Sequence, residues 1–399
     1  MLLQDYCFYS KDKTSIATCN VNNYISTENM CPNKEGVQPA SKLPEVDFVS
    51  AYKPNDVLIS NIRPYFKKIY FAKNSGGCSN DVLVMRANEN TYPKFLYYLL
   101  SQQDFFDYST KSSKGTKMPR GDKNAIMHFN CPAFIYEEQK AIADVLSSFD
   151  DKIELNNKII KNLEEQAQSL YKHWFVDFEF SNEDGNPYKS SGGKFKESEL
   201  GLIPEDWDVL SFGDLFKIKS GYPFKSSTYL DEGCFKIITI KNVLEDGLDT
   251  SKVSYINALP SDLPEYCKLN IGDILVSLTG NIGRVCSVIE NNLLLNQRVG
   301  KIYCANDNYK NFINCILKQQ CIKDMLISIS RGTAQQNLSP VECLNLKIPG
   351  NLKFIEEFSK LVDGFISKNI ELQIENKKLE ETRDYLLQKL MNGEIEVGN

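Results

Sequence analysis

The sequence has 399 residues, of which 42% are hydrophobic and 25% charged, a composition typical of a globular protein with two or three domains. The N-terminus becomes polar by Gln4, and no apolar run approaches the roughly 20 residues of a membrane span, so we expect a cytoplasmic protein without a signal peptide. The 12 cysteines include no Cys-x-x-Cys pair and the only histidines are His128 and His173, which argues against a disulfide framework and a bound metal.

The net charge of −6 would by itself argue against nucleic acid as a partner, but the acidic residues are concentrated in two segments. Residues 137–165 carry eight acidic and four basic side chains, and residues 353–399 carry ten acidic and seven basic ones. The two segments account for −7, which leaves the rest of the chain at +1, with local basic clusters. These other parts of the chain can therefore face a polyanion.

The chain is a tandem repeat with an offset of 217 residues. The run Asp56-Val57-Leu58-Ile59-Ser60 corresponds to Asp273-Ile274-Leu275-Val276-Ser277, and Gly115-Thr116 corresponds to Gly332-Thr333 at the same offset. One gap later, Leu163-Glu164-Glu165 corresponds to Leu379-Glu380-Glu381 at an offset of 216. Each repeat is much longer than the unit of a solenoid, so the sequence predicts two copies of one domain plus one helix.

In chain order, we expect a first domain at residues 1–135, a helical segment at 136–180, a Gly/Ser-rich linker at 181–205, a second domain at 206–350 and a second helical segment at 351–395. Both domains have short runs of Val, Ile, Phe and Tyr between Gly, Pro, Asn and Asp, a pattern typical of strands. The expected fold class is α+β, with two similar domains of mixed strands and helices separated by two long helices. Asp122 and Ser339, which are also 217 residues apart, suit the N-cap of a short helix in each domain.

The long helices have matching apolar seams. Seam positions recur in alternating steps of four and three from Ile142 to Trp174, and nine of these ten residues are apolar. The same phase runs from Phe358 to Leu390 with three polar interruptions. Such a seam is typical of a coiled coil, and antiparallel pairing is favoured because the second domain must bring the chain back. The alternative is that each helix packs only on its own domain.

The sequence does not contain the motifs of a self-sufficient enzyme. It has no complete phosphate-binding loop of the G-x-x-x-x-G-K-[ST] type, since Gly193-Lys194 is followed by Phe195. Asn186-Pro187-Tyr188 lacks the second proline of the methyltransferase Asn-Pro-Pro-Tyr signature and lies in the expected linker. With two unaccompanied histidines, acid–base catalysis by histidine has little to work with. We therefore expect a non-catalytic chain that needs no cofactor.

Polar loops that recur in both domains are candidates for DNA contact. One loop follows the repeated Asp-(Val/Ile)-(Leu)-(Ile/Val)-Ser strand and the other contains the repeated Gly-Thr. Arginine and lysine suit phosphates and guanine, and asparagine and glutamine can pair with adenine. The alternative for any single residue is a solvated loop position. The candidates are Arg63, Lys67, Lys68, Ser79, Asn80, Lys114, Gly115, Thr116, Lys117 and Arg120 in the first copy, and Thr279, Asn281, Arg284, Asn296, Gln297, Arg298, Arg331, Gly332, Thr333, Gln335, Gln336 and Asn337 in the second.

Several segments resemble the specificity subunits of type I restriction–modification systems. Residues 200–209, Leu-Gly-Leu-Ile-Pro-Glu-Asp-Trp-Asp-Val, and 220–224, Ser-Gly-Tyr-Pro-Phe, look like the start of a target-recognition domain of that family. Residues 137–143, Glu-Glu-Gln-Lys-Ala-Ile-Ala, look like its first spacer helix, whereas Phe354-Ile355-Glu356-Glu357-Phe358 lacks the glutamine found at Gln139. The resemblance covers essentially the whole chain.

This resemblance implies a DNA-binding subunit of an anti-phage restriction system, with two target-recognition domains that read a bipartite, asymmetric site. It also implies two adenine methyltransferase subunits and the restriction (ATPase-nuclease) subunits as partners, which use S-adenosylmethionine, ATP and Mg, whereas this chain itself does not. The alternative is the recognition subunit of a methylation-only system or an orphan DNA-binding protein.

Overall fold

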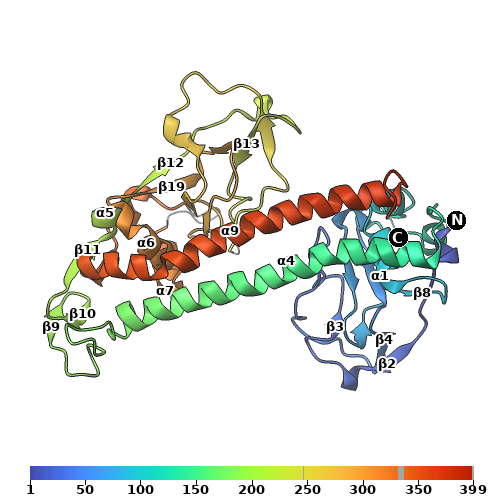
Figure 1. Ribbon diagram of the computed structural model, residues 1–399, viewed down its shortest axis with the longest axis horizontal. Helices are drawn as coiled ribbons and strands as arrows, with labels where there is room; N and C mark the ends of the chain where they lie inside the picture. Colours follow the sequence, from blue (N-terminus) through green and yellow to red (C-terminus); the bar gives the residue numbers. More distant parts are fainter. Residues whose placement is uncertain (246, 331–336, 398–399) are drawn as a thin grey trace. The chain divides into compact units, whose positions relative to one another are not determined.

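The computed structural model describes residues 1–245, 247–330 and 337–397, which fold into two compact units (Figure 1). The first unit comprises Met1–Ile153 and the chain from Lys378 onwards, and the second comprises Glu154–Lys377. Each unit contains one of the duplicated domains and a part of both long helices. The predicted α+β class is confirmed.

The first unit contains two four-stranded sheets. The first sheet has the strand order β1-β8-β5-β6 and is antiparallel throughout, and the second has the order β2-β4-β7-β3, with β3 and β7 parallel. The strands are β1 (Cys7–Tyr9), β2 (Lys13–Ser15), β3 (Tyr24–Ile25), β4 (Phe48–Tyr52), β5 (Val57–Ser60), β6 (Ile69–Phe71), β7 (Gly76–Cys78) and β8 (Val82–Ala87). Three helices follow: α1 (Pro93–Leu100), α2 (Gln103–Lys111) and α3 (Lys123–Met127).

The second unit repeats the first sheet, and its second sheet differs in one edge strand: β2 pairs with β4 in the first unit, whereas β14 pairs with β13, a member of the parallel pair, in the second. Its sheets have the orders β12-β19-β16-β17 and β14-β13-β18-β15, again with one parallel pair, β13 and β18. The strands are β12 (Phe216–Ser220), β13 (Phe235–Ile238), β14 (Ser254–Ile256), β15 (Lys268–Leu269), β16 (Ile274–Ser277), β17 (Val285–Ser287), β18 (Leu293–Leu295) and β19 (Val299–Cys304). The helices are α6 (Lys310–Leu317), α7 (Gln320–Ser328) and α8 (Pro340–Leu344). Every bound of β5, β8, α1, α2 and α3 recurs 217 residues later.

The central strands are buried on both faces. On β5, Val57 and Ile59 pack in one core with α1, whereas Leu58 faces a second core that includes Tyr52. On β16, Ile274 and Leu275 separate in the same way between two cores. This alternation follows from the two-residue period of a strand. Burial on both faces explains why the repeated motif is apolar at successive positions. The loops after β5 and β16 begin where these buried strands end, after Ser60 and Ser277.

Residues 181–205 are more ordered than the expected linker. They contain a hairpin of β9 (Phe195–Ser198) and β10 (Gly201–Pro204), and the ring of Phe195 packs edge-on against that of Phe178 at 5.8 Å. The second domain is then closed by β11 (Asp208–Ser211), which pairs with β20 (Lys347–Gly350), and by the short helix α5 (Phe212–Leu215). A sequence rich in glycine and serine therefore forms a turn-rich substructure here.

The two long helices are α4 (Tyr136–Tyr171), which continues as a π-helical turn over Lys172–Val176, and α9 (Leu352–Met391) (Figure 1). Within the first unit, Ile142 and Leu146 of α4 share a core with Leu387 and Leu390 of α9. Within the second unit, Ala167 and Tyr171 of α4 share a core with residues 358 and 362 of α9. Residues early in one helix thus meet residues late in the other, so the predicted antiparallel pairing is confirmed. The seams also pack on both domains.

A polar layer interrupts the helix seam in the second unit. Asn156 is fully buried, and its amide nitrogen donates to Asn376 Oδ1 at 2.8 Å and to Glu375 Oε2 at 2.9 Å. Asn376 in turn donates to Asn157 Oδ1 at 2.8 Å. Among the residues with described positions, the Asn156 oxygen itself has no hydrogen-bond partner. Buried asparagines in a helix seam lower stability but define which residues face each other.

An aromatic cluster joins α4, α9 and the second domain. Phe358 of α9 is fully buried, with its ring centroid 5.3 Å from Phe175 and 5.9 Å from Trp174. Trp207, also fully buried, lies 5.4 Å from Phe175. Trp174 and Trp207 are the two tryptophans of the protein, so tryptophan fluorescence reports on the packing of this cluster alone.

The predicted N-caps of the short helices are confirmed. Asp122 accepts hydrogen bonds from the amides of Asn124 and Ala125, and Ser339 accepts one from Glu342 at 3.4 Å. We expect Ser339→Ala to destabilise the second unit by about 0.5–1 kcal/mol, because the first turn of α8 loses its side-chain acceptor. Urea unfolding followed by tryptophan fluorescence measures this, with the exposed Ser328→Ala as the control. An unchanged unfolding midpoint for Ser339→Ala would show that the cap contributes nothing.

Candidate nucleic-acid interface

Three of the predicted polar segments meet at one edge of the first unit. The amide of Asn61, directly after β5, donates to the carbonyl of Asp81 at 2.8 Å, and the amide of Gly121 donates to the carbonyl of Asn61 at 3.0 Å. Arg63 is connected in the same way to Pro119 at 2.8 Å. The residues around 61–68, 79–81 and 114–121 therefore form one continuous surface, which we call the first loop cluster.

The second unit repeats these hydrogen bonds at the same offset. The amide of Leu278 donates to the carbonyl of Arg298 at 3.1 Å, and the amide of Leu338 donates to the carbonyl of Leu278 at 2.8 Å. Thr279 and Asn337 form an antiparallel bridge, as Ile62 and Arg120 do in the first unit. The segments 278–284, 296–298 and 337–338 form the second loop cluster. The backbone framework is thus shared, while the side chains on it differ.

The basic side chains of the first loop cluster have different environments. Lys114 pairs with Asp122 at 2.6 Å, and Arg120 pairs with Asp81 at 3.1 Å. Lys67 donates to the side chain of Gln103. Because these cations are partly exposed, their ion pairs are weak and can be exchanged for phosphate contacts.

Lys68 and Arg63 contact backbone carbonyls and an aromatic ring, and within the described part of the cluster neither is paired with a carboxylate. Lys68 Nζ donates to the carbonyl of Thr27 at 2.6 Å, and burial lowers the pKa of this ammonium group from its ordinary value. Arg63 donates to the carbonyl of Lys117 at 3.4 Å, and its guanidinium lies 6.0 Å from the ring of Phe66. Both side chains add positive charge to the first loop cluster.

The remaining candidates of the first copy are mostly open to solvent. Ser79 is half-buried and its amide donates to the carbonyl of Ile25, so it has a structural role. The exposed candidates are Asn80, Gly115, Thr116 and Lys117. These four residues have the accessibility that direct contact with a partner requires.

The candidates of the second copy divide in a similar way. Thr279 is buried and its hydroxyl donates to Asn337 Oδ1 at 2.8 Å. With its amide group turned, Asn281 accepts from the Arg284 guanidinium at 3.0 Å, and Arg284 also lies 4.0 Å from Glu245. Asn296 is half-buried and donates to the Tyr229 hydroxyl at 3.5 Å. Gln297 and Arg298 are exposed, whereas Arg331, Gly332, Thr333, Gln335 and Gln336 lie outside the described residues.

Tyr65 and Phe66 were not among the candidates chosen from the sequence. Both are exposed large aromatics at the tip of the first loop cluster, between Arg63 and Lys67. The run of a proline and two aromatic residues between basic residues could have indicated an exposed contact site. It was missed because aromatic residues in a strand-rich domain are ordinarily assigned to the core.

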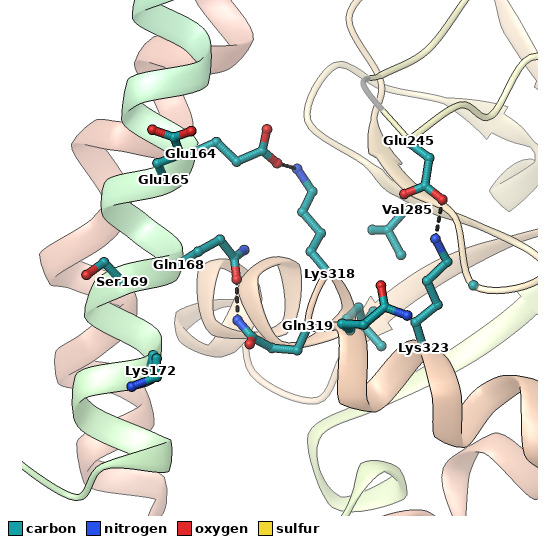
Figure 2. A pocket seen from close by; sticks show the side chains of 13 residues that line it. Glu164, Glu165, Gln168, Ser169, Lys172, Glu245, Val285, Lys318, Gln319 and Lys323 are labelled. Atoms are coloured by element: carbon teal, nitrogen blue, oxygen red, sulfur yellow. Dashed lines mark hydrogen bonds and ion pairs between the residues drawn. The ribbon is translucent and has the colours of Figure 1, made fainter. Parts of the chain in front are cut away.

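A polar pocket of about 610 Å³ lies elsewhere in the second unit, between α4 and the α6–α7 turn (Figure 2). In Figure 2, Glu164 pairs with Lys318, Gln168 accepts from Gln319, and Lys323 pairs with Glu245. The first two pairs join α4 to the α6–α7 turn, and the third lies within the second domain. The first two attach the helix to the domain, and we assign the pocket this structural role.

The described residues also bear on the presence of a metal site, a reactive thiol and a membrane span. No group of three or more histidine, cysteine, aspartate or glutamate side chains there is arranged to hold a metal ion. Burial raises the pKa of the Cys286 and Cys343 thiols to about 12, which keeps them protonated. None of the described helices has the length and apolarity needed to cross a membrane.

Comparisons with known proteins agree with this architecture. Residues 10–165 and 204–378 match the family described as type I restriction modification DNA specificity domain. The chain is 29% identical over 390 residues to the type I restriction enzyme MjaVIII specificity subunit of Methanocaldococcus jannaschii, covering 94% of this chain and 86% of that protein. It is 26% identical to the HindI specificity subunit of Haemophilus influenzae, covering 86% of this chain and 87% of that protein.

A solved structure has the same fold. The crystal structure of the type I restriction–modification system S subunit from M. genitalium superposes with a TM-score of 0.56 at 18% identity, covering 98% of this chain and 95% of that one. The two matched segments of the family profile coincide with the two duplicated domains, each followed by part of a long helix.

Proposed function

Because the chain belongs to the type I restriction–modification DNA specificity family, we propose that its two domains read the two halves of a bipartite, asymmetric DNA sequence. In this proposal the first loop cluster contacts one half-site and the second loop cluster contacts the other. The chain itself is non-catalytic, and its long helices dock two adenine methyltransferase subunits and the restriction subunits. S-adenosylmethionine, ATP and Mg are then used by those partners.

One observation carries this proposal: the same backbone hydrogen bonds support different side chains in the two copies. Asn61 and Leu278 occupy equivalent positions in the two frameworks. The first cluster offers mainly lysine and arginine, whereas the second offers Asn281, Gln297 and Asn337 alongside its arginines. A common scaffold with divergent contact residues suits two different half-sites, whereas a palindrome would require identical ones.

Exchange of the second domain tests this assignment. Residues 206–350 are replaced by the equivalent domain of a related specificity subunit, and the chain is assembled with its methyltransferase subunits. We expect one half of the modified sequence to change and the other half to be retained, because each loop cluster is built within a single unit. Sequencing of methylated bases in host DNA gives the result. A simultaneous change in both halves, from an assembled complex, would contradict the proposal.

A further inference from the structure

The turn at the tip of the first loop cluster carries two exposed aromatic side chains. Tyr65 and Phe66 belong to a 3₁₀ turn, Pro64–Phe66, and their side chains are exposed by 48% and 38%. The two rings pack on each other with centroids 4.8 Å apart. Together they form an apolar projection on a surface that also carries polar and basic groups and the exposed side chain of Met118.

The backbone on both sides of this projection has an unfavourable conformation that hydrogen bonds from a neighbouring segment stabilise. Arg63 and Lys67, which flank the turn, have φ values of +50° and +52°, a left-handed conformation that non-glycine residues rarely adopt. The carbonyls of Phe66 and Lys67 accept hydrogen bonds from the amides of Asn33 and Lys34 at 2.8 and 3.0 Å. Strain that the surrounding structure maintains is often found at functional positions.

The charge around the tip is complementary to a polyanion. Arg63 and Lys68 lie 6.0 and 5.9 Å from the Phe66 ring centroid, and Lys117 is exposed on the adjoining loop. Asp81 of the cluster pairs with Arg120, the adjacent Asp122 pairs with Lys114, and the carboxylate of Glu28 interacts with Lys68. An apolar projection surrounded by cations matches duplex DNA, in which apolar base faces lie between two phosphate backbones.

The second domain lacks this feature. The corresponding loop, residues 278–284, is one residue shorter and contains no aromatic residue, and its one large apolar residue after Leu278, Ile282, is buried. The same framework therefore presents an aromatic pair in one copy and none in the other. The second half-site thus provides a control within the same complex.

We propose that Tyr65 and Phe66 form a wedge that inserts at a base step of the half-site read by the first domain and stacks on a base that this insertion exposes. Recognition of that half-site then depends on how easily the step unstacks, in addition to contacts with base edges. This proposal rests on the proposed function, and it adds two contact residues and recognition through the ease of unstacking a base step.

The test uses the full chain assembled with its methyltransferase subunits, and duplexes with 2-aminopurine placed in turn at each step of either half-site. We expect wild-type binding to raise 2-aminopurine fluorescence at one step of the first half-site and at none of the second. Tyr65→Ala/Phe66→Ala should abolish this increase and weaken binding about tenfold or more, as loss of base stacking does elsewhere. Tyr65→Phe should retain both properties.

Control variants separate the wedge from the proposed function. Lys117→Ala should weaken binding and lower its salt dependence, but at saturating protein it should leave the fluorescence increase intact. Wild-type affinity and fluorescence in the double alanine variant would refute the wedge while leaving the proposed function standing. Loss of methyltransferase assembly in that variant would also refute it, by showing that the tip contacts a protein. If neither half-site sequence affects binding of the wild-type complex, the proposed function itself fails.

Discussion

Replacement of Phe358 by alanine is expected to destabilise the second unit by about 3–5 kcal/mol, a large part of the total stability of an ordinary domain. The Phe358 ring is fully buried and packs against the rings of Tyr171, Trp174, Phe175 and Phe312. Its removal leaves a cavity lined by α4, the π-helical turn after it, α6 and α9, and rigid aromatic neighbours cannot close it easily. The greater helix propensity of alanine offsets only a small part of this loss.

Tryptophan fluorescence during urea unfolding measures this effect, because Trp174 lies 5.9 Å from Phe358 and Trp207 belongs to the same cluster. We expect a lower unfolding midpoint with the slope unchanged. The matched control is Leu361→Ala, on the same helix but exposed, which should change stability by less than about 0.5 kcal/mol. A midpoint for Phe358→Ala equal to that of the control would show that the cluster does not stabilise the unit.

Single and double substitutions of the buried asparagines should differ in their effect on stability. Asn376→Leu removes the acceptor 2.8 Å from the Asn156 amide nitrogen, and we expect a loss of about 1–3 kcal/mol because a buried amide loses one of its two acceptors, the other being Glu375. Asn156→Leu with Asn376→Leu replaces the pair by apolar groups and should be close to neutral or stabilising. The non-additivity of the two changes, obtained from a double-mutant cycle by the same fluorescence method, is the coupling of the pair.

The exposed Asn162 of α4 provides the control for that cycle, since Asn162→Leu leaves no buried group unpaired. If the double variant loses as much stability as the sum of the single variants, the two asparagines act independently, and the hydrogen bond between them has no energetic role.

The duplication allowed much of the fold to be predicted from the sequence. Asp122 and Ser339 cap equivalent helices, and the apolar seams pair in antiparallel fashion, because these features depend on local spacing. The sequence could not show that Asn156 would face Asn376, since this depends on the register between segments far apart in the chain. The hairpin within residues 181–205 was also missed, because glycine and serine there form turns between short strands.

The sequence predicted which segments could lie together, but it did not predict the contacts of individual side chains. The polar segments of each copy do come together, but composition gave no indication that Thr279 would be buried. Nor did it show that Asp81 would pair with Arg120, because such pairs depend on how loops approach each other in space. Tyr65 and Ile282 lie in corresponding loops and both carry an apolar ring or chain, yet one is exposed and the other buried. Whether such a residue projects or packs is decided by the backbone of the turn.

The asparagine layer also distinguishes the two helices from each other. By the 216-residue offset, the positions equivalent to Asn156 and Asn376 are Leu372 and Ile160. If α4 paired with the α4 of another copy in the same register, Asn156 would face Ile160, and in an α9–α9 pair Asn376 would face Leu372. Each like pair would bury two asparagine amides against aliphatic side chains, whereas the unlike pair lets them bond to each other. Two helices descended from one ancestor have in this way become complementary and ceased to be interchangeable.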